Sequence, residues 1–115
     1  MFNNQWLFGE RARIDFGSGV PVVSADSRMS THEGCACISD AQGNLIFYTN
    51  GVKVWDAQGA VKIRDLKGDG SSTQSAIIVP DPNPAAADSY YIFTTDGFTS
   101  KSEHHLEGIH FNTND

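Results

Sequence analysis

Short apolar runs alternate with turn residues along almost the whole chain, a rhythm typical of β-strands. The runs are rich in Val, Ile, Phe, Tyr and Thr, and clusters of Gly, Asn, Asp or Pro separate them. Helical periodicity is nearly absent, because the one Ala-rich segment, 82–89, is short and rich in proline. The pattern predicts strands at residues 5–9, 12–16, 21–24, 35–39, 45–49, 52–56, 60–63, 75–80, 90–96 and 108–112.

The turns between these runs are tight, which predicts that each strand pairs with its predecessor. In the run 52–56, Val52 and Val54 alternate with Lys53 and Trp55, as expected for one strand with two different faces. Asn50 and Gly51 precede this run and adopt positive φ readily, so they suit a tight turn. We therefore expect an all-β fold built from antiparallel meanders.

Two stretches of the chain share one plan, which points to a repeat. Residues 33–63 and 75–112 each hold an apolar strand, a loop and an aromatic-rich strand, and Phe47 and Phe93 occupy matching places. A repeat of about 40–50 residues made only of strands is typical of four-stranded β-propeller blades. We predict about two blades of an incomplete propeller in a single segment, 1–115, with flanking strands in 5–24. The alternative is one β-sandwich whose hairpins resemble each other by chance.

Length and charge narrow the classes of function. The 115 residues suffice for one small domain, and the net charge of −6 argues against a nucleic-acid partner. No apolar run approaches the roughly 18 residues of a membrane span, and the first residues do not resemble a signal peptide.

Cys35 and Cys37 lie on one face of a strand, so we expect free thiols rather than a disulfide.

Six motifs occur in order along most of the chain. They are Trp-x-Phe-Gly at 6–9, Asp-Phe-x-x-Gly at 15–19, Glu-Gly-Cys-Ala at 33–36, Asn-Gly-x-x-x-Trp at 50–55, Ser-Ser-Thr-Gln-Ser-x-x-x-Val-Pro at 71–80 and Tyr-Tyr-x-Phe-Thr at 90–94. Together they resemble the amino-terminal propeller-like region of large surface proteins of gliding bacteria of the Bacteroidetes type, which are exported by type IX secretion. The segment 98–112 fits that pattern only loosely, and Cys37 stands where the pattern has a small polar residue.

The resemblance implies a propeller-like fold and an extracellular or cell-surface setting, although this chain shows neither a signal peptide nor a sorting domain. It implies a non-catalytic module for adhesion, gliding motility or assembly. The sequence lacks a nucleophile motif and a phosphate-binding glycine loop, which agrees with a non-enzyme. The alternatives are a fragment of a propeller-type hydrolase and a structural subunit of a larger particle.

Four polar residues are candidate ligand contacts. Asp69 lies in the loop 65–72, whose carboxylates could offer oxygens to Ca²⁺, although the loop lacks the spacing of a calcium-binding loop and fits a plain connection better. Thr73 and Gln74 precede an apolar strand and either contact a ligand or bond to the backbone, and we favour the backbone role. Glu33 either forms an acid–base pair with His32 or fixes the loop before its strand, and we favour the loop.

Aromatic and histidine side chains supply the remaining candidates. We expect most aromatic residues, Trp6 and Phe8 included, in the core, while Tyr48 and Tyr91 are candidates for an exposed face that binds glycans. The histidines His104, His105 and His110 do not form a metal set, because adjacent residues on a strand point to opposite faces and zinc needs further ligands. We therefore predict no metal site and no cofactor, with Ca²⁺ as the one alternative.

Two blades alone leave sheet edges and apolar faces uncovered. We therefore expect this chain to associate with the rest of a longer propeller chain, with copies of itself or with another protein partner.

Overall fold

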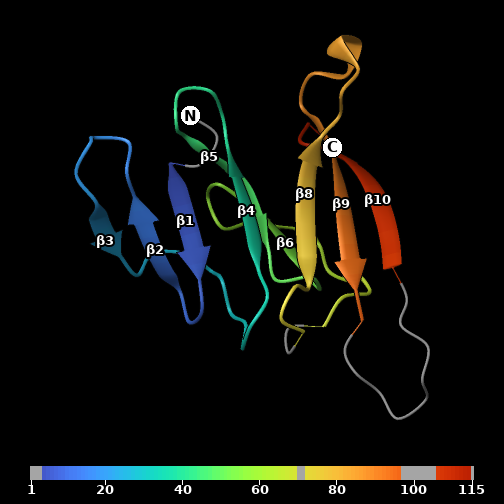
Figure 1. Ribbon diagram of the computed structural model, residues 1–115, viewed down its shortest axis with the longest axis horizontal. Coiled ribbons are helices and arrows are strands. Elements are labelled where there is room, and N and C mark those ends of the chain that lie inside the picture. The colour runs from blue at the N-terminus through green and yellow to red at the C-terminus, as the bar shows by residue number, and fades with distance from the viewer. Residues whose placement is uncertain (1–3, 70–71, 97–105, 115) are drawn as a thin grey trace.

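The computed structural model describes residues 4–69, 72–96 and 106–114. In these residues the chain forms three antiparallel sheets, one after another along the sequence (Figure 1). The N-terminal sheet holds β1 (Gln5–Phe8), β2 (Ala12–Asp15) and β3 (Val22–Ser24). The central sheet holds β4 (Ala36–Ser39), β5 (Leu45–Thr49), β6 (Val54–Asp56) and β7 (Val61–Ile63). The C-terminal sheet holds β8 (Ala76–Pro80), β9 (Ser89–Thr95) and β10 (Leu106–Asn112).

The predicted all-β class and the antiparallel meanders are confirmed. Strand order follows chain order in every sheet, and the central sheet is a four-stranded meander. The strands predicted to flank the two repeats form a sheet of their own, and the C-terminal repeat provides three described strands. The described part of the chain contains a single 3-10 turn, Pro84–Ala86, capped by the side chain of Asn83. It contains no helix long and apolar enough to cross a membrane.

One tetrapeptide, Asp-Ala-Gln-Gly, builds both outer hairpin turns of the central sheet. It occurs at 40–43 between β4 and β5 and at 56–59 between β6 and β7. In each turn the aspartate Oδ1 accepts two backbone N–H groups, at 2.9 Å in all four cases. Gly43 and Gly59 supply the positive φ, +86° and +85°, that closes each turn. The same local sequence therefore yields the same turn twice.

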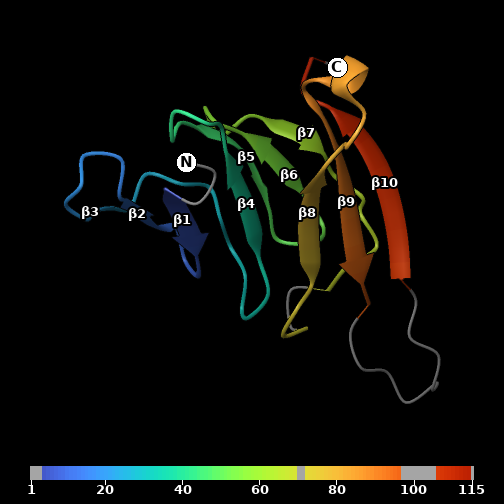
Figure 2. The same ribbon diagram turned by 45° about the horizontal axis from the view of Figure 1, so that its top comes forward.

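The central sheet lies between the other two sheets and is buried on both of its faces (Figure 2). Toward the C-terminal sheet, Phe47 and Val54 pack with Ile92 and Phe111. Toward the N-terminal sheet, Tyr48 and Trp55 pack with Leu7 and Met29. The alternation along β5 and β6 thus has two apolar sides, one for each neighbouring sheet.

The first strands of the three sheets lie next to one another. β1 contacts β4, and β4 contacts β8. In Figure 1, β2 and β3 lie to the left of β1, and β9 and β10 lie to the right of β8. The sheets therefore meet along their first strands.

We predict that Ile92→Ala lowers the free energy of unfolding by about 2–5 kcal/mol, because it removes a fully buried side chain between two sheets. Urea unfolding at a fixed protein concentration measures this change. The matched control is Val20→Ala, whose side chain is exposed, and it should change stability by less than about 0.5 kcal/mol. Equal effects of the two substitutions would contradict the proposed core.

Candidate functional site

The polar motif residues gather at the end of the molecule where β4 and β8 begin. Gly34 lies against the chain before β8, and its N–H donates to the carbonyl of Ser72 at 3.0 Å. Thr31 Oγ1 donates to the carbonyl of Gly34 at 2.9 Å. A Cβ at position 34 would collide with the backbone nitrogen of Ser75 and the carbonyl oxygen of Ser72. Glycine is required here because two backbone segments touch.

The turn after β5 is fastened to the same place. Asn50 Oδ1 accepts the N–H groups of Val52 and Lys53 at 3.0 and 2.8 Å, and Asn50 Nδ2 donates to the carbonyl of Ser30 at 2.9 Å. Ser75 Oγ donates to the carbonyl of Asn50 at 3.2 Å. Backbone groups from three loops are thereby satisfied by short polar side chains. We call this network, made by residues 30–34, 49–53 and 72–75, the polar junction.

Four of the six predicted site residues lie at or beside the polar junction. Thr73 Oγ1 donates to Glu33 Oε2 at 3.3 Å in an exposed contact. Gln74 Nε2 donates to the carbonyl of Ala76 at 3.5 Å, and the backbone carbonyl of Asp69 accepts the N–H of Ser72 at 3.0 Å. The fold therefore brings together residues that the sequence offered only as separate candidates. Gln74 bonds to the backbone, the role favoured for it, whereas the Thr73 hydroxyl bonds to a side chain.

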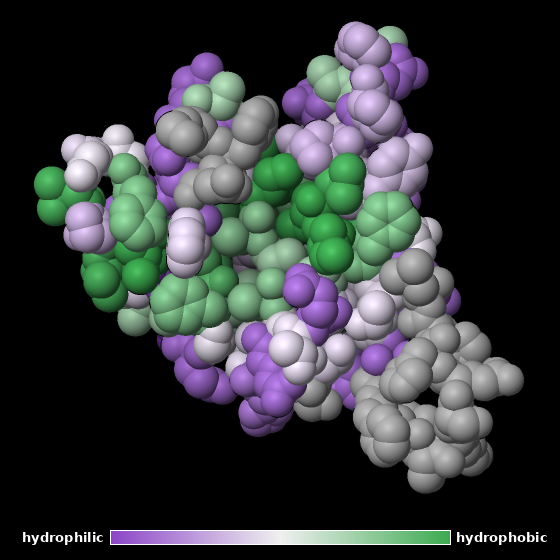
Figure 3. All heavy atoms as spheres, viewed as in Figure 1, coloured by the Kyte–Doolittle hydropathy of each residue, from purple (hydrophilic) through white to green (hydrophobic). Residues whose placement is uncertain are grey.

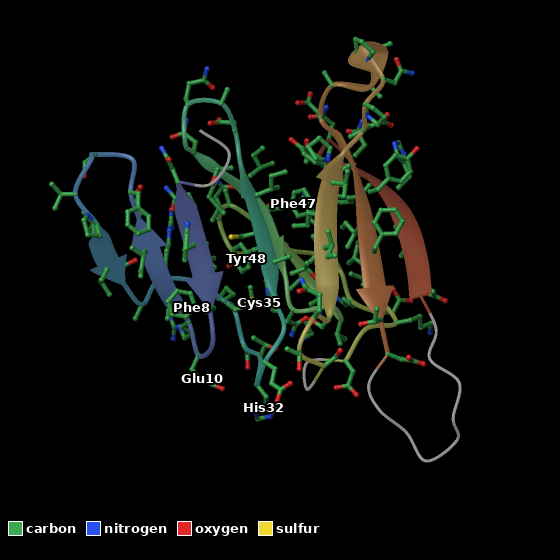
Figure 4. All side chains as sticks on the ribbon, viewed as in Figure 1. Phe8, Glu10, His32, Cys35, Phe47 and Tyr48 are labelled. Atoms are coloured by element: carbon green, nitrogen blue, oxygen red, sulfur yellow. The ribbon has the colours of Figure 1, made fainter. Side chains whose placement is uncertain are left out.

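Tyr48 requires a correction, because it does not line an exposed face. Its side chain is 2% exposed and stacks on Trp55 with ring centroids 5.4 Å apart. Its hydroxyl oxygen accepts the backbone N–H of Arg28 at 2.8 Å. Because the hydroxyl group has this hydrogen-bond partner inside the fold, the tyrosine can be buried. In Figure 4 it lies with the core residues of the central sheet.

Tyr91 lies far from the polar junction along β9, on the outward face of the C-terminal sheet. It is half-buried, with its ring stacked near Phe93 at 6.3 Å and tilted against His110 at 4.8 Å. His110 Nε2 lies 2.8 Å from Asp81 Oδ2. Hydrogen bonds from the Asn83 N–H and from His110 lower the pKa of the Asp81 carboxyl group.

Metal-binding residues do not converge in the described part of the chain. No group of three or more His, Cys, Asp or Glu side chains there could hold a metal ion. His104 and His105 lie outside the described residues.

The two cysteines have a structural task that the sequence did not reveal. Cys35 Sγ donates to the carbonyl of Leu7 at 3.3 Å, and Cys37 Sγ donates to that of Gln5 at 3.2 Å. Both carbonyls belong to the edge of β1 that faces β4, and the two-residue spacing is the same on both strands. Burial raises the pKa of both thiols. The thiols therefore bond to the edge of β1 that is not paired with β2, and their raised pKa lowers the fraction of thiolate at neutral pH.

A groove of about 410 Å³ follows this contact between β1 and β4. Its lining is largely apolar and includes Phe8 and Cys35, which lie on neighbouring segments (Figure 4).

The outward faces of the two outer sheets are apolar and exposed, which the sequence did not predict for the N-terminal sheet. Trp6 and Phe8 were expected in the core, yet they are 53% and 41% exposed. In β1 only Gln5 and Leu7 turn inward. On the C-terminal sheet, Ile77 and Val79 are exposed in the same manner. Figure 3 shows hydrophobic side chains over both sheets on one side of the molecule.

No family model, no curated protein and no solved structure matches this chain.

We predict that Gly34→Ala destabilises the protein by about 2–3 kcal/mol, because the added methyl group must displace backbone atoms of the polar junction. The neighbouring Glu33→Gln should change the free energy of unfolding by less than about 0.5 kcal/mol, since its contact is exposed. Chemical denaturation of both variants measures the difference. A tolerated alanine at position 34 would contradict this description of the junction.

We also predict that iodoacetamide alkylates the native cysteines more slowly at neutral pH than it alkylates the unfolded chain. Only the thiolate reacts, and burial raises both thiol pKa values, so fewer thiolates are present in the native state. Mass spectrometry over time measures the rates, and Cys37→Ser isolates Cys35. Equal rates in the native and unfolded chains would show that the thiols do not face β1 as described.

Proposed function

We propose that this chain is a non-catalytic scaffold module of β-propeller type, which works by packing its sheets against further sheets. The observation that carries the proposal is the pair of outward apolar faces at the two ends of a three-sheet stack. Both faces of the central sheet are already covered, each by one of the outer sheets. The exposed faces carry the same kind of side chain, so a sheet is the natural cover for them.

The arrangement of strands supports blades rather than a sandwich. In a propeller each blade is an antiparallel meander, and the blades meet around a central axis. Here all three sheets run in chain order, and their first strands β1, β4 and β8 lie next to one another. A β-sandwich consists of two packed sheets, whereas this chain packs three sheets in chain order. The four-stranded central sheet corresponds to one complete blade in this proposal.

The use of the motif residues supports a non-catalytic role. Thr31, Asn50 and Ser75 satisfy backbone groups of the polar junction. The cysteine thiols bond to carbonyls of β1. The contacts of Ser75 and of the two cysteines connect segments of neighbouring sheets, as a scaffold role requires.

The setting at the cell surface or outside the cell, and a part in adhesion, rest on the resemblance of the six motifs. The partner in this proposal is a set of further blades on another copy of the chain.

We expect the thermal midpoint of the purified chain to rise with protein concentration, because association that covers the apolar faces stabilises the folded state. Differential scanning calorimetry at several concentrations measures it. Trp6→Ser, on an exposed face, should weaken the dependence, while Gln58→Ser at the exposed turn before β7 should leave it unchanged. A midpoint that is independent of concentration, together with a monomeric mass, would contradict the proposal.

A further inference from the structure

We infer that two copies of this chain close into one ring of six sheets, with the C-terminal sheet of each copy packed on the N-terminal sheet of the other. This inference rests on the proposed scaffold function and specifies its partner.

The pairing registers define the two faces. On the N-terminal sheet, Trp6 lies opposite Ile14, and Ile14 lies opposite Val23, so these three share the outward face. Phe16 extends that face, since its ring meets Trp6 edge-on at 5.7 Å. Phe8 belongs to it as well. We call this set face N.

On the C-terminal sheet, Ile77 lies opposite Phe93, and Val79 lies opposite Tyr91. Phe93 lies opposite Gly108, and a Cβ at that glycine would be 3.0 Å from the Phe93 ring. The Phe93 ring therefore lies over β10 at Gly108, where a larger residue would collide with it. We call Ile77, Val79, Tyr91, Phe93 and the neighbouring His110 face C.

The contacts between the three sheets of one chain show how the apolar face of a sheet is covered by the next sheet. The order of contact is β1 to β4 and β4 to β8, each time between first strands. Packing face C on face N of another copy continues this order from β8 to a further β1. The two faces are different, so the contact is heterologous, and such contacts form a closed ring when the rotation allows it.

The direction of the faces favours closure over an open filament. Figure 3 shows hydrophobic side chains over the N-terminal sheet at the left and over β8 to the right of centre, in a single view. Because both faces open toward this one side, a single second copy can cover both of them. Two chains of three sheets give six, which lies within the four to eight blades of closed propellers.

The exposed apolar area is of the size that a stable dimer needs. Taking about 200 Å² for an aromatic and about 100 Å² for an aliphatic side chain, the exposed parts of six residues amount to roughly 400 Å². These residues are Trp6, Phe8, Phe16, Val23, Ile77 and Val79. A standard interface buries about 800 Å² per partner, a little over half of it apolar. The two faces together therefore match one standard interface.

Charge does not oppose the contact, although the chain carries a net charge of −6. Face N contains no charged side chain. On face C, the basic side chain His110 is paired with the carboxylate of Asp81. Two acidic copies can therefore approach each other through these faces without bringing like charges into direct contact.

Light scattering coupled to size exclusion tests the stoichiometry. We expect a mass of twice the 12.5 kDa of the chain, with no larger species as concentration rises. Phe8→Lys on face N and Val79→Glu on face C should each shift the mass toward that of one chain. When the two variants are mixed, the dimer should return. One of its interfaces is then wild type, and the introduced lysine faces the introduced glutamate at the other.

Gln58→Lys, at the exposed turn between β6 and β7, is the matched control and should keep the dimer. Circular dichroism must show that each variant remains β-folded. A dimer that both variants leave intact, a mixture that does not restore the dimer, or larger open assemblies would overturn the ring while leaving a scaffold function in place. A wild-type chain that stays monomeric at every concentration would overturn both proposals.

Discussion

The central sheet, buried on both faces, is the constraint on which the rest of the structure depends. A sheet with one apolar face can rest on a single partner, but this sheet has two apolar faces and needs a sheet on either side. Phe47 and Tyr48 are neighbours on β5 and enter opposite cores. The chain before β4 and the chain after β7 therefore both have to return to the central sheet, and each does so as a further antiparallel sheet.

The two outer sheets cover the central sheet, but each of them has an uncovered apolar face of its own. Each outer sheet packs one face into the core and leaves the other exposed, with Trp6 exposed on the N-terminal sheet and Ile77 exposed on the C-terminal sheet. In such a stack, the exposed apolar faces of the two outer sheets are removed from water only when the sheets form a closed ring or when a partner protein packs on them. The packing inside the chain and the assembly role that we propose for it therefore have the same physical cause.

Polar residues have the complementary task of holding the sheets in order. The polar junction joins the starts of β4 and β8 through Gly34, Asn50 and Ser75, and the thiols of Cys35 and Cys37 join β4 to β1. These groups satisfy backbone atoms that sheet pairing leaves over, so their chemistry is directional and local. In this structure the junction residues and the thiols connect neighbouring sheets.

The sequence by itself determined the strands, the turns and the antiparallel order, because alternation and the Asp-Ala-Gln-Gly turns act over a few residues. It offered Glu33, Thr73 and Gln74 as separate candidate contacts, and only the folded chain brings Thr73 to Glu33. Only the tertiary structure decided that Tyr48 is buried and Trp6 exposed, although both lie in alternating strands. The pattern within a strand distinguishes its two faces, but which face meets another sheet depends on contacts between residues far apart in the chain.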